Sequence, residues 1–162
     1  MLLQFPKNRY QGIATQIVEF KMGERRLGVE VAKVVEIVNA KNLAPVPESD
    51  AVLQGVINIR GNVLPTISLS SRLGLAPSVV GVQSRVIILD VLGLNVGILV
   101  DSVVLALQNT SGARVKSRAE GIPDEYVQFI VEMNGSDIPI LNVERLLDEE
   151  EKKKLEKLRQ TF

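Results

Sequence analysis

The sequence of 162 residues predicts an all-β protein made of two small β-barrels and a C-terminal α-helix. Three observations lead to this prediction: an internal repeat, short apolar segments of period two separated by turn residues, and a charged tail of different composition. Each repeat spans about 70 residues and contains about five short strands. We therefore expect one barrel in each half, over residues of about 15–80 and about 84–147.

The repeat consists of two aligned blocks in the same order. Residues 16–35 match residues 85–104 at an offset of 69, and residues 50–73 match residues 124–147 at an offset of 74. Hydrophobic positions keep their phase through both blocks, and turn residues coincide. The offset changes within loop stretches, which tolerate insertions. This pattern indicates a duplicated unit.

Each unit is expected to open with a hairpin. Residues 15–22 alternate between apolar and polar side chains, as in a half-buried strand, whereas residues 85–91 are apolar on both faces apart from Asp90 and predict a more buried one. The turn signals GER and LGLN follow these segments and predict a hairpin with the next strand. A short turn and a third strand are expected after Val31 and after Val100.

The later strands of each unit are short. The segments GVINI, VLPTI, QFIVEM and DIPIL read as strands, and a short helix is predicted over about 49–53. Pro65 and Pro139 lack a backbone N–H, so we expect their strands at sheet edges or bulges. Residues 1–14 are expected to form a flexible or edge segment.

The tail, residues 148–162, reads as a charged helix. Acidic residues stand at its beginning and basic residues follow, which suits both i,i+4 ion pairs and the helix dipole. Its few leucines can form an apolar stripe. We expect this helix to dock on the β-sheet body.

Composition excludes several classes of function. The chain has no His and no Cys, so imidazole bases, cysteine nucleophiles and the usual zinc or haem ligands are missing. Lys plus Arg equals Asp plus Glu at 19 each, and aromatic residues make up 4%, which disfavours nucleic-acid binding. No phosphate-binding loop or nucleophile elbow is present. We expect no catalytic residues, no metal and no cofactor.

One segment, VINIRG, is chemically unusual because Asn58 and Arg60 interrupt an apolar strand. Arg60 stands at the strand end, next to a glycine turn. It either forms a structural ion pair with a carboxylate or anchors a partner, since arginine is enriched at binding hot spots. These residues alone leave both readings open.

The run QGVINIRGNVLPTISL, followed by SRLGL, resembles the signature of the CheW family of chemotaxis coupling proteins. LGVEVAKVVEIV upstream and VGILVDSVVLAL and IPILNVERLL downstream are similar to further segments of that family. The resemblance covers about 15–148. Ser68 and Ser70 depart from the family pattern, where Asp and Arg are usual.

The resemblance implies two five-stranded barrels of SH3-like topology and a scaffolding function. Such a protein would bridge the cytoplasmic tips of chemoreceptors (methyl-accepting chemotaxis proteins) and the regulatory domain of a CheA-type histidine kinase, with other copies of the chain as a further partner. It would be cytoplasmic and recruited to membrane-bound receptor arrays, without inserting into the membrane or binding nucleic acid. Signalling would proceed by differential binding rather than catalysis.

The resemblance also implies a set of receptor-binding residues, while kinase-binding residues cannot be assigned. In this sequence the receptor-binding positions are Val34, Glu36, Gly55, Asn58, Arg60, Val100 and Val103. Gly55 is expected to let a receptor helix approach the backbone closely. Glu36 and Arg60 are expected to form an ion pair.

Three alternatives stay open at this point. A coupling protein of a pilus or developmental chemosensory system would have the same pattern. A nucleic-acid-binding twin barrel would show salt-dependent binding to DNA or RNA. A small-molecule-binding or enzymatic barrel would need a pocket with clustered carboxylates.

Overall fold

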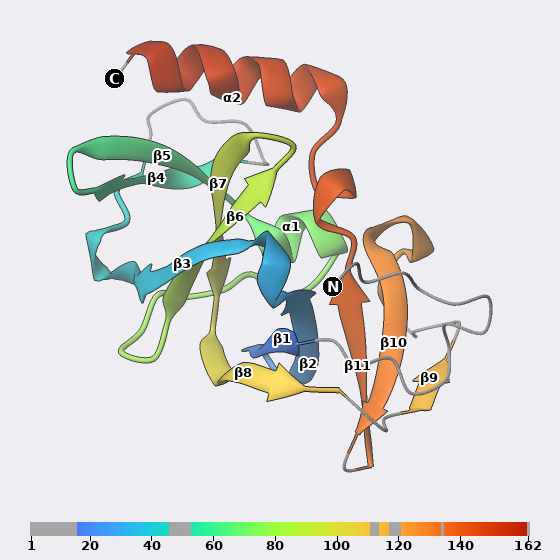
Figure 1. Ribbon diagram of the computed structural model, residues 1–162. Coiled ribbons are helices and arrows are strands. Elements are labelled where there is room, and N and C mark those ends of the chain that lie inside the picture. Colours follow the sequence, from blue (N-terminus) through green and yellow to red (C-terminus); the bar gives the residue numbers. More distant parts are fainter. Residues whose placement is uncertain (1–15, 46–52, 111–113, 117–120, 134, 162) are drawn as a thin grey trace.

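The body of the protein consists of two β-sheets, and one longer helix lies beside the five-stranded sheet (Figure 1). The computed structural model describes residues 16–45, 53–110, 114–116, 121–133 and 135–161. One sheet has the strand order β8-β1-β2-β11-β10-β9, and the other has the order β3-β6-β7-β5-β4. The all-β prediction with a C-terminal helix is confirmed.

The elements have the following bounds. The first sheet contains β1 (Gln16–Met22), β2 (Arg25–Glu30), β8 (Ser102–Asn109), β9 (Arg114–Lys116), β10 (Val127–Met133) and β11 (Ser136–Leu141). The second contains β3 (Val34–Asn39), β4 (Leu53–Ile59), β5 (Asn62–Ile67), β6 (Arg85–Val91) and β7 (Leu94–Val100). The helical segments are η1 (Val31–Lys33), η2 (Ala40–Asn42), α1 (Leu69–Leu73), η3 (Asp124–Tyr126), η4 (Val143–Arg145) and α2 (Glu149–Thr161).

The two sheets do not follow the two sequence repeats. Each sheet combines the opening hairpin of one repeat with later strands of the other: β1–β2 join β8, β10 and β11, and β6–β7 join β3, β4 and β5. The strand order contradicts the expectation of one barrel within about 15–80 and another within about 84–147. Local periodicity predicts strands and hairpins, but it carries no information about which distant strands pair.

The exchange of hairpins preserves the internal repeat in three dimensions. The order β8-β1-β2-β11-β10 corresponds strand by strand to β3-β6-β7-β5-β4. The parallel contacts correspond as well: Ile140 pairs with Gly28 and Thr66 with Gly97, which are equivalent pairs at the offsets of 74 and 69. The molecule therefore has a pseudo-twofold relation between its sheets.

Several local predictions fall outside the described residues or need correction. The segment 1–14 and most of the helix predicted over about 49–53 lie outside them. The short helix α1 was not predicted; Ser68 caps it and Gly74, with φ of 71°, ends it. Short turns and a third strand after Val31 and after Val100 are confirmed.

Of the two expected settings for Pro65 and Pro139, a sheet edge or a bulge, the sheet edge is wrong, while the strands paired with theirs do contain register shifts, between Leu53 and Gly55 and between Val127 and Phe129. Pro65 lies in β5, between β7 and β4, and Pro139 lies in β11, between β2 and β10. Both are tolerated because the parallel pairing on the other side of each strand is short: it begins at Thr66 in β5 and is restricted to Ile140 in β11.

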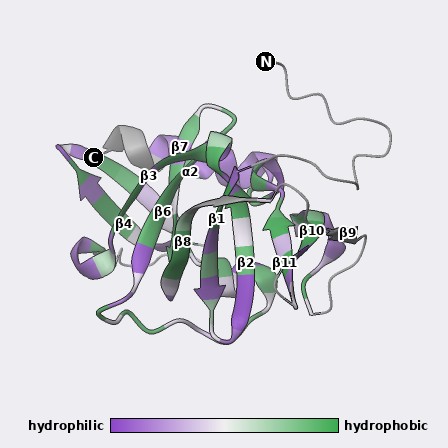
Figure 2. Cartoon of the chain, turned by 60° about the horizontal axis from the view of Figure 1, so that its bottom comes forward, coloured by the Kyte–Doolittle hydropathy of each residue, from purple (hydrophilic) through white to green (hydrophobic). Residues whose placement is uncertain are grey.

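A large shared core joins the two sheets, and each sheet has a smaller cluster of its own. The shared core contains Phe20, Leu27, Leu89 and Ile98, all fully buried. The second sheet encloses Ala40, Ile57, Leu64, Val86, Ile88 and Leu99, and the first encloses Ile17, Phe129, Val131, Ile138 and Ile140. Figure 2 shows β6 and β7 as mostly hydrophobic, as expected for a strand pair packed on both faces.

The C-terminal helix α2 docks on the body as predicted (Figure 1). Asp148 and Glu151 cap its start reciprocally: each carboxylate accepts the backbone N–H of the other residue. Leu155 is buried in the shared core, and Arg72 of α1 pairs with Glu151. No helix in the described ranges is long and apolar enough to cross a membrane.

The hairpin between β6 and β7 holds a leucine in a strained conformation. Leu92 has φ of 51°, the following Gly93 has φ of 91°, and Leu92 is 67% exposed. Its equivalent in the first repeat is Gly23. Positive φ at both central residues is typical of a type I′ turn, which favours Asn-Gly.

We therefore expect Leu92→Asn to stabilise the protein by about 1 kcal/mol, since asparagine tolerates this conformation and leucine does not. Thermal unfolding would show a raised Tm. A lowered Tm would mean that the exposed leucine makes a packing contribution larger than its backbone strain.

Candidate functional site

The ion pair expected between Glu36 and Arg60 is present. Arg60 Nη1 donates to Glu36 Oε1 at 3.0 Å, and Nη2 donates to Oε2 at 2.9 Å. This bidentate geometry joins β3 to the β4–β5 turn, although the two residues are far apart in the strand order. The Arg60 side chain is 76% exposed and that of Glu36 is 29% exposed. A partner can therefore reach the guanidinium.

The β4–β5 turn presents Arg60 through an unusual backbone conformation. Arg60 has φ of 51°, and Asn58 Oδ1 accepts the backbone N–H of Gly61 at 2.8 Å. Asn58 thus stabilises the turn, which explains its presence in an apolar strand. A bulky residue at positive φ is strained, and such strain is concentrated at functional positions.

The ion pair borders a hollow of about 490 Å³ at one end of the five-stranded sheet. Its lining combines polar side chains with Leu64 and Ile88 of the hydrophobic cluster enclosed by this sheet. The lining residues are Val35, Glu36, Ile59, Arg60, Gly61, Asn62, Val63, Leu64, Ile88 and Asn95.

Electrostatics keep the pair charged. The hydrogen bonds from Arg60 lower the pKa of the Glu36 carboxyl below its ordinary value, and Glu36 raises the pKa of Arg60 in turn. Within the described residues, no cluster of three or more Asp and Glu side chains could hold a metal ion. The exposed charged pair and the hollow beside it can contact a partner through charge and shape.

The structure places the apolar positions that the resemblance assigns to the binding surface at different depths. Val100 is fully buried in the shared core, and Val34 and Val103 are half-buried against it. The next residues along the chain are the exposed ones: Val35 is 54% exposed and Val104 is 45% exposed.

Both exposed valines sit in β-bulges at equivalent positions of the two repeats. In β3, Val34 pairs with Leu89 and Glu36 with Ile88, so Val35 is the extra residue. In β8, the register shifts at the same place, and Val104 is skipped. A bulge turns a side chain out of its alternating pattern. The resemblance carries the valine positions over one by one, and it does not show which neighbouring residue a bulge turns outward.

Gly55 has a structural role different from the one expected. A Cβ there would stand 2.3 Å from the carbonyl oxygen of Ala44 and 3.3 Å from Pro45 Cα. Ala44 forms a two-way backbone bridge with Val56, at 2.8 Å in each direction, which links the segment after β3 to β4. The close approach permitted by Gly55 is thus internal, and it nearly closes the second sheet into a barrel.

We expect Gly55→Ala to lower stability by about 1–3 kcal/mol, because the added methyl group must displace backbone rather than a flexible side chain. Chemical denaturation would report the loss. Gly61→Ala is a comparison variant: it meets no atom within 4 Å, so its effect isolates the strain of its φ of 86°. An unchanged unfolding midpoint for Gly55→Ala would contradict the bridge as a constraint.

The fold and the site together define a β-sheet binding protein that works through its surfaces. Two like sheets present equivalent bulged edges, and a charged pair lies beside a polar hollow at one of them.

The comparisons with known proteins give the family. The family model for the CheW-like domain matches residues 16–151, so the chain belongs to the CheW family. It is 28% identical over 149 residues to "Chemotaxis protein CheW" of Treponema pallidum, with 88% of each chain covered. It is also 30% identical over 132 residues to "Protein FrzA" of Myxococcus xanthus, covering 79% of this chain and 82% of that protein.

The fold is shared with a solved member of the family. The crystal structure of the scaffolding protein TtCheW from Thermoanaerobacter tengcongensis superposes with a TM-score of 0.75 at 26% sequence identity. The match covers 83% of this chain and 88% of that one. The family resemblance and the SH3-like double-sheet fold are confirmed.

Proposed function

We propose that this chain is a chemotaxis adaptor that couples transmembrane chemoreceptors to a CheA-type histidine kinase by protein–protein binding. The observation that supports this most directly is the bidentate Glu36–Arg60 pair, exposed beside a hollow on a protein of the CheW family. In this function the protein is cytoplasmic, is recruited to receptor arrays and catalyses no reaction.

The proposed receptor-facing surface is built around the two bulged edges. It keeps Glu36 and Arg60 and takes the exposed Val35 and Val104 in place of the half-buried Val34 and Val103 and the buried Val100. Val35 supplies apolar area next to the ion pair, and arginine beside apolar area is a common hot-spot arrangement. Register shifts at both edges disfavour strand addition, so a helical partner suits this surface better.

A coupling function in a pilus or developmental system is the second candidate. The similarity to FrzA of Myxococcus xanthus and to PilI of Pseudomonas aeruginosa favours it. Both candidates use the same kind of surface and differ in which receptor and kinase are bound.

The purified chain tests the proposal when mixed with receptor-containing membranes and full-length CheA-type kinase. We expect it to sediment with the membranes and to increase the amount of kinase that sediments with them. Binding to neither component would overturn the proposal. Binding preferentially to the components of a pilus or developmental system would establish the second candidate.

A further inference from the structure

The crossover from the first sheet to the second is fastened by an ion pair that the proposed receptor surface does not include. The segment η1 connects β2 of the first sheet to β3 of the second. Lys33 is its last residue, and Lys33 Nζ lies 2.9 Å from Glu144 Oε2. Glu144 belongs to η4, in the second repeat. The pair therefore joins the start of β3 to a distant segment of the chain.

The segment η4 gives this pair a firmly packed anchor. Val143, which precedes Glu144, is buried in the shared core, and η4 packs against β6. The hydrogen bond to Glu144 raises the pKa of Lys33, and the carboxylates of Glu30 and Asp90 raise it further. Lys33 is thus held as a cation between segments of both repeats.

The bulge of β3 lies immediately after this fastening. Within β3, which the structure describes in full, Val34 alone pairs with β6 before the bulge, whereas the four residues from Glu36 to Asn39 pair after it. Val35 is the extra residue between them. A bulge interrupts the hydrogen-bond ladder, so pairing alone holds the short side of the strand weakly. The position of Val35 therefore depends on what holds Lys33.

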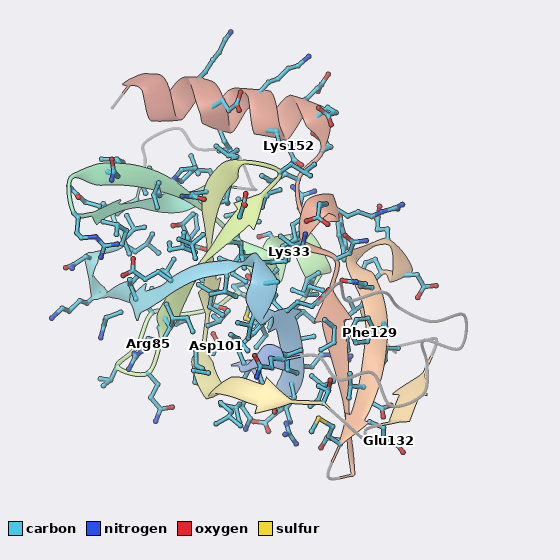
Figure 3. The ribbon with its side chains drawn as sticks, in the orientation of Figure 1. Lys33, Arg85, Asp101, Phe129, Glu132 and Lys152 are labelled. Atoms are coloured by element: carbon cyan, nitrogen blue, oxygen red, sulfur yellow. The ribbon has the colours of Figure 1, made fainter. Side chains whose placement is uncertain are left out.

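The equivalent bulge of β8 is fastened as well, by different chemistry. The Asp101 carboxylate accepts the N–H of Gly23 at 2.5 Å, and the N–H of Asp101 donates to Lys21 O at 3.0 Å. Figure 3 labels Asp101 and Lys33 at the starts of the two bulged strands. Ala32 is the equivalent of Asp101 at the offset of 69 and has no carboxylate. Because each repeat fastens its bulged strand at the crossover with an unlike side chain, the fastening is a shared feature of the two edges.

Given the receptor-binding function proposed above, we propose that Lys33 and Glu144 are positioning residues for the receptor surface. Their ion pair holds the bulge of β3 so that Val35 stands beside the Glu36–Arg60 pair. Neither residue has to touch the receptor itself. Because an ion pair with side chains 37% and 34% exposed is weak, its loss changes receptor affinity a few-fold and does not abolish binding.

Thiols placed at the two positions test this proposal, since the chain has no Cys. The variant Lys33→Cys/Glu144→Cys removes the ion pair, and a short bismaleimide crosslinker then joins the two positions without restoring the charges. We expect the unlinked variant to bind receptor-containing membranes about fivefold more weakly than wild type, with a similar Tm. The amides from Val34 to Ile37 should exchange hydrogen about fivefold faster, as followed by NMR. Linking the thiols should restore both quantities.

The matched control is Glu149→Cys/Lys152→Cys on α2. Lys152 Nζ lies 3.0 Å from Glu149 Oε1, so this variant removes an ion pair of the same composition from a different element. Receptor binding and amide exchange in β3 should stay at the wild-type values, with and without the crosslinker.

Each of three results would overturn the inference. Wild-type amide exchange in the unlinked Lys33→Cys/Glu144→Cys variant would show that the pair does not hold the bulge. Faster exchange with unchanged receptor affinity would show that binding does not depend on the position of the bulge. Receptor affinity that stays low after linking would assign Lys33 or Glu144 to direct contact with the receptor. By contrast, failure of the wild-type chain to bind receptor membranes would refute the proposed function, and amide exchange would still decide whether the pair positions the bulge.

Discussion

Arg60→Glu should abolish receptor-dependent kinase control while leaving the protein folded. The substitution removes an exposed guanidinium and places two carboxylates together, since Glu36 is the residue that Arg60 contacts. Exposed ion pairs contribute little to stability, so the Tm should change little. Kinase activity in reconstituted receptor arrays measures the effect. Lys153→Glu makes the same charge change on the exposed face of α2 and should have no effect.

Adding Glu36→Arg to this variant should restore part of the control, because the reversed pair can again link β3 to the β4–β5 turn. Partial rescue would show two separate contributions. The restored part reflects the ion pair that holds the β4–β5 turn, and the part still lost reflects the changed charge that a partner contacts at position 60. If Arg60→Glu alone leaves kinase control intact, the hollow is not the coupling surface. If the double variant is fully inactive, the partner itself requires the guanidinium at position 60.

The sequence predicts most strands because they follow from local patterns, whereas the Glu36–Arg60 pair is expected only through the resemblance to the CheW family. Alternation of apolar residues and glycine turns define the hairpins. The exchange of hairpins between repeats is invisible locally, because the contacts Gly28–Ile140 and Gly97–Thr66 join distant segments. The bulges at Val35 and Val104 escape prediction for a related reason: a bulge is defined by the partner strand, which the sequence does not name.

The pseudo-twofold relation also allows residues at equivalent positions of the two repeats to be compared directly. Glu19 in β1 has no exposed side-chain surface, and its carboxylate pairs with Arg26 of β2, which is 25% exposed. The equivalent positions at the offset of 69 are occupied by Ile88 and Asn95, which carry no charge. Glu19 lies opposite Gly28 as Ile88 lies opposite Gly97, so the two environments correspond.

Arg26→Asn should therefore destabilise the protein by about 3 kcal/mol, because it strands a buried carboxylate whose other oxygen, Oε1, has no hydrogen-bond partner. The double variant Glu19→Ile/Arg26→Asn, which copies the second repeat into the first, should recover to within about 1 kcal/mol of wild type or exceed it, since apolar packing can replace a buried pair. Urea unfolding of the wild type, both single variants and the double variant gives the coupling energy. If the double variant is as unstable as Arg26→Asn, then the loss does not come from an unpaired Glu19, and the equivalence of the two sites does not extend to their energetics.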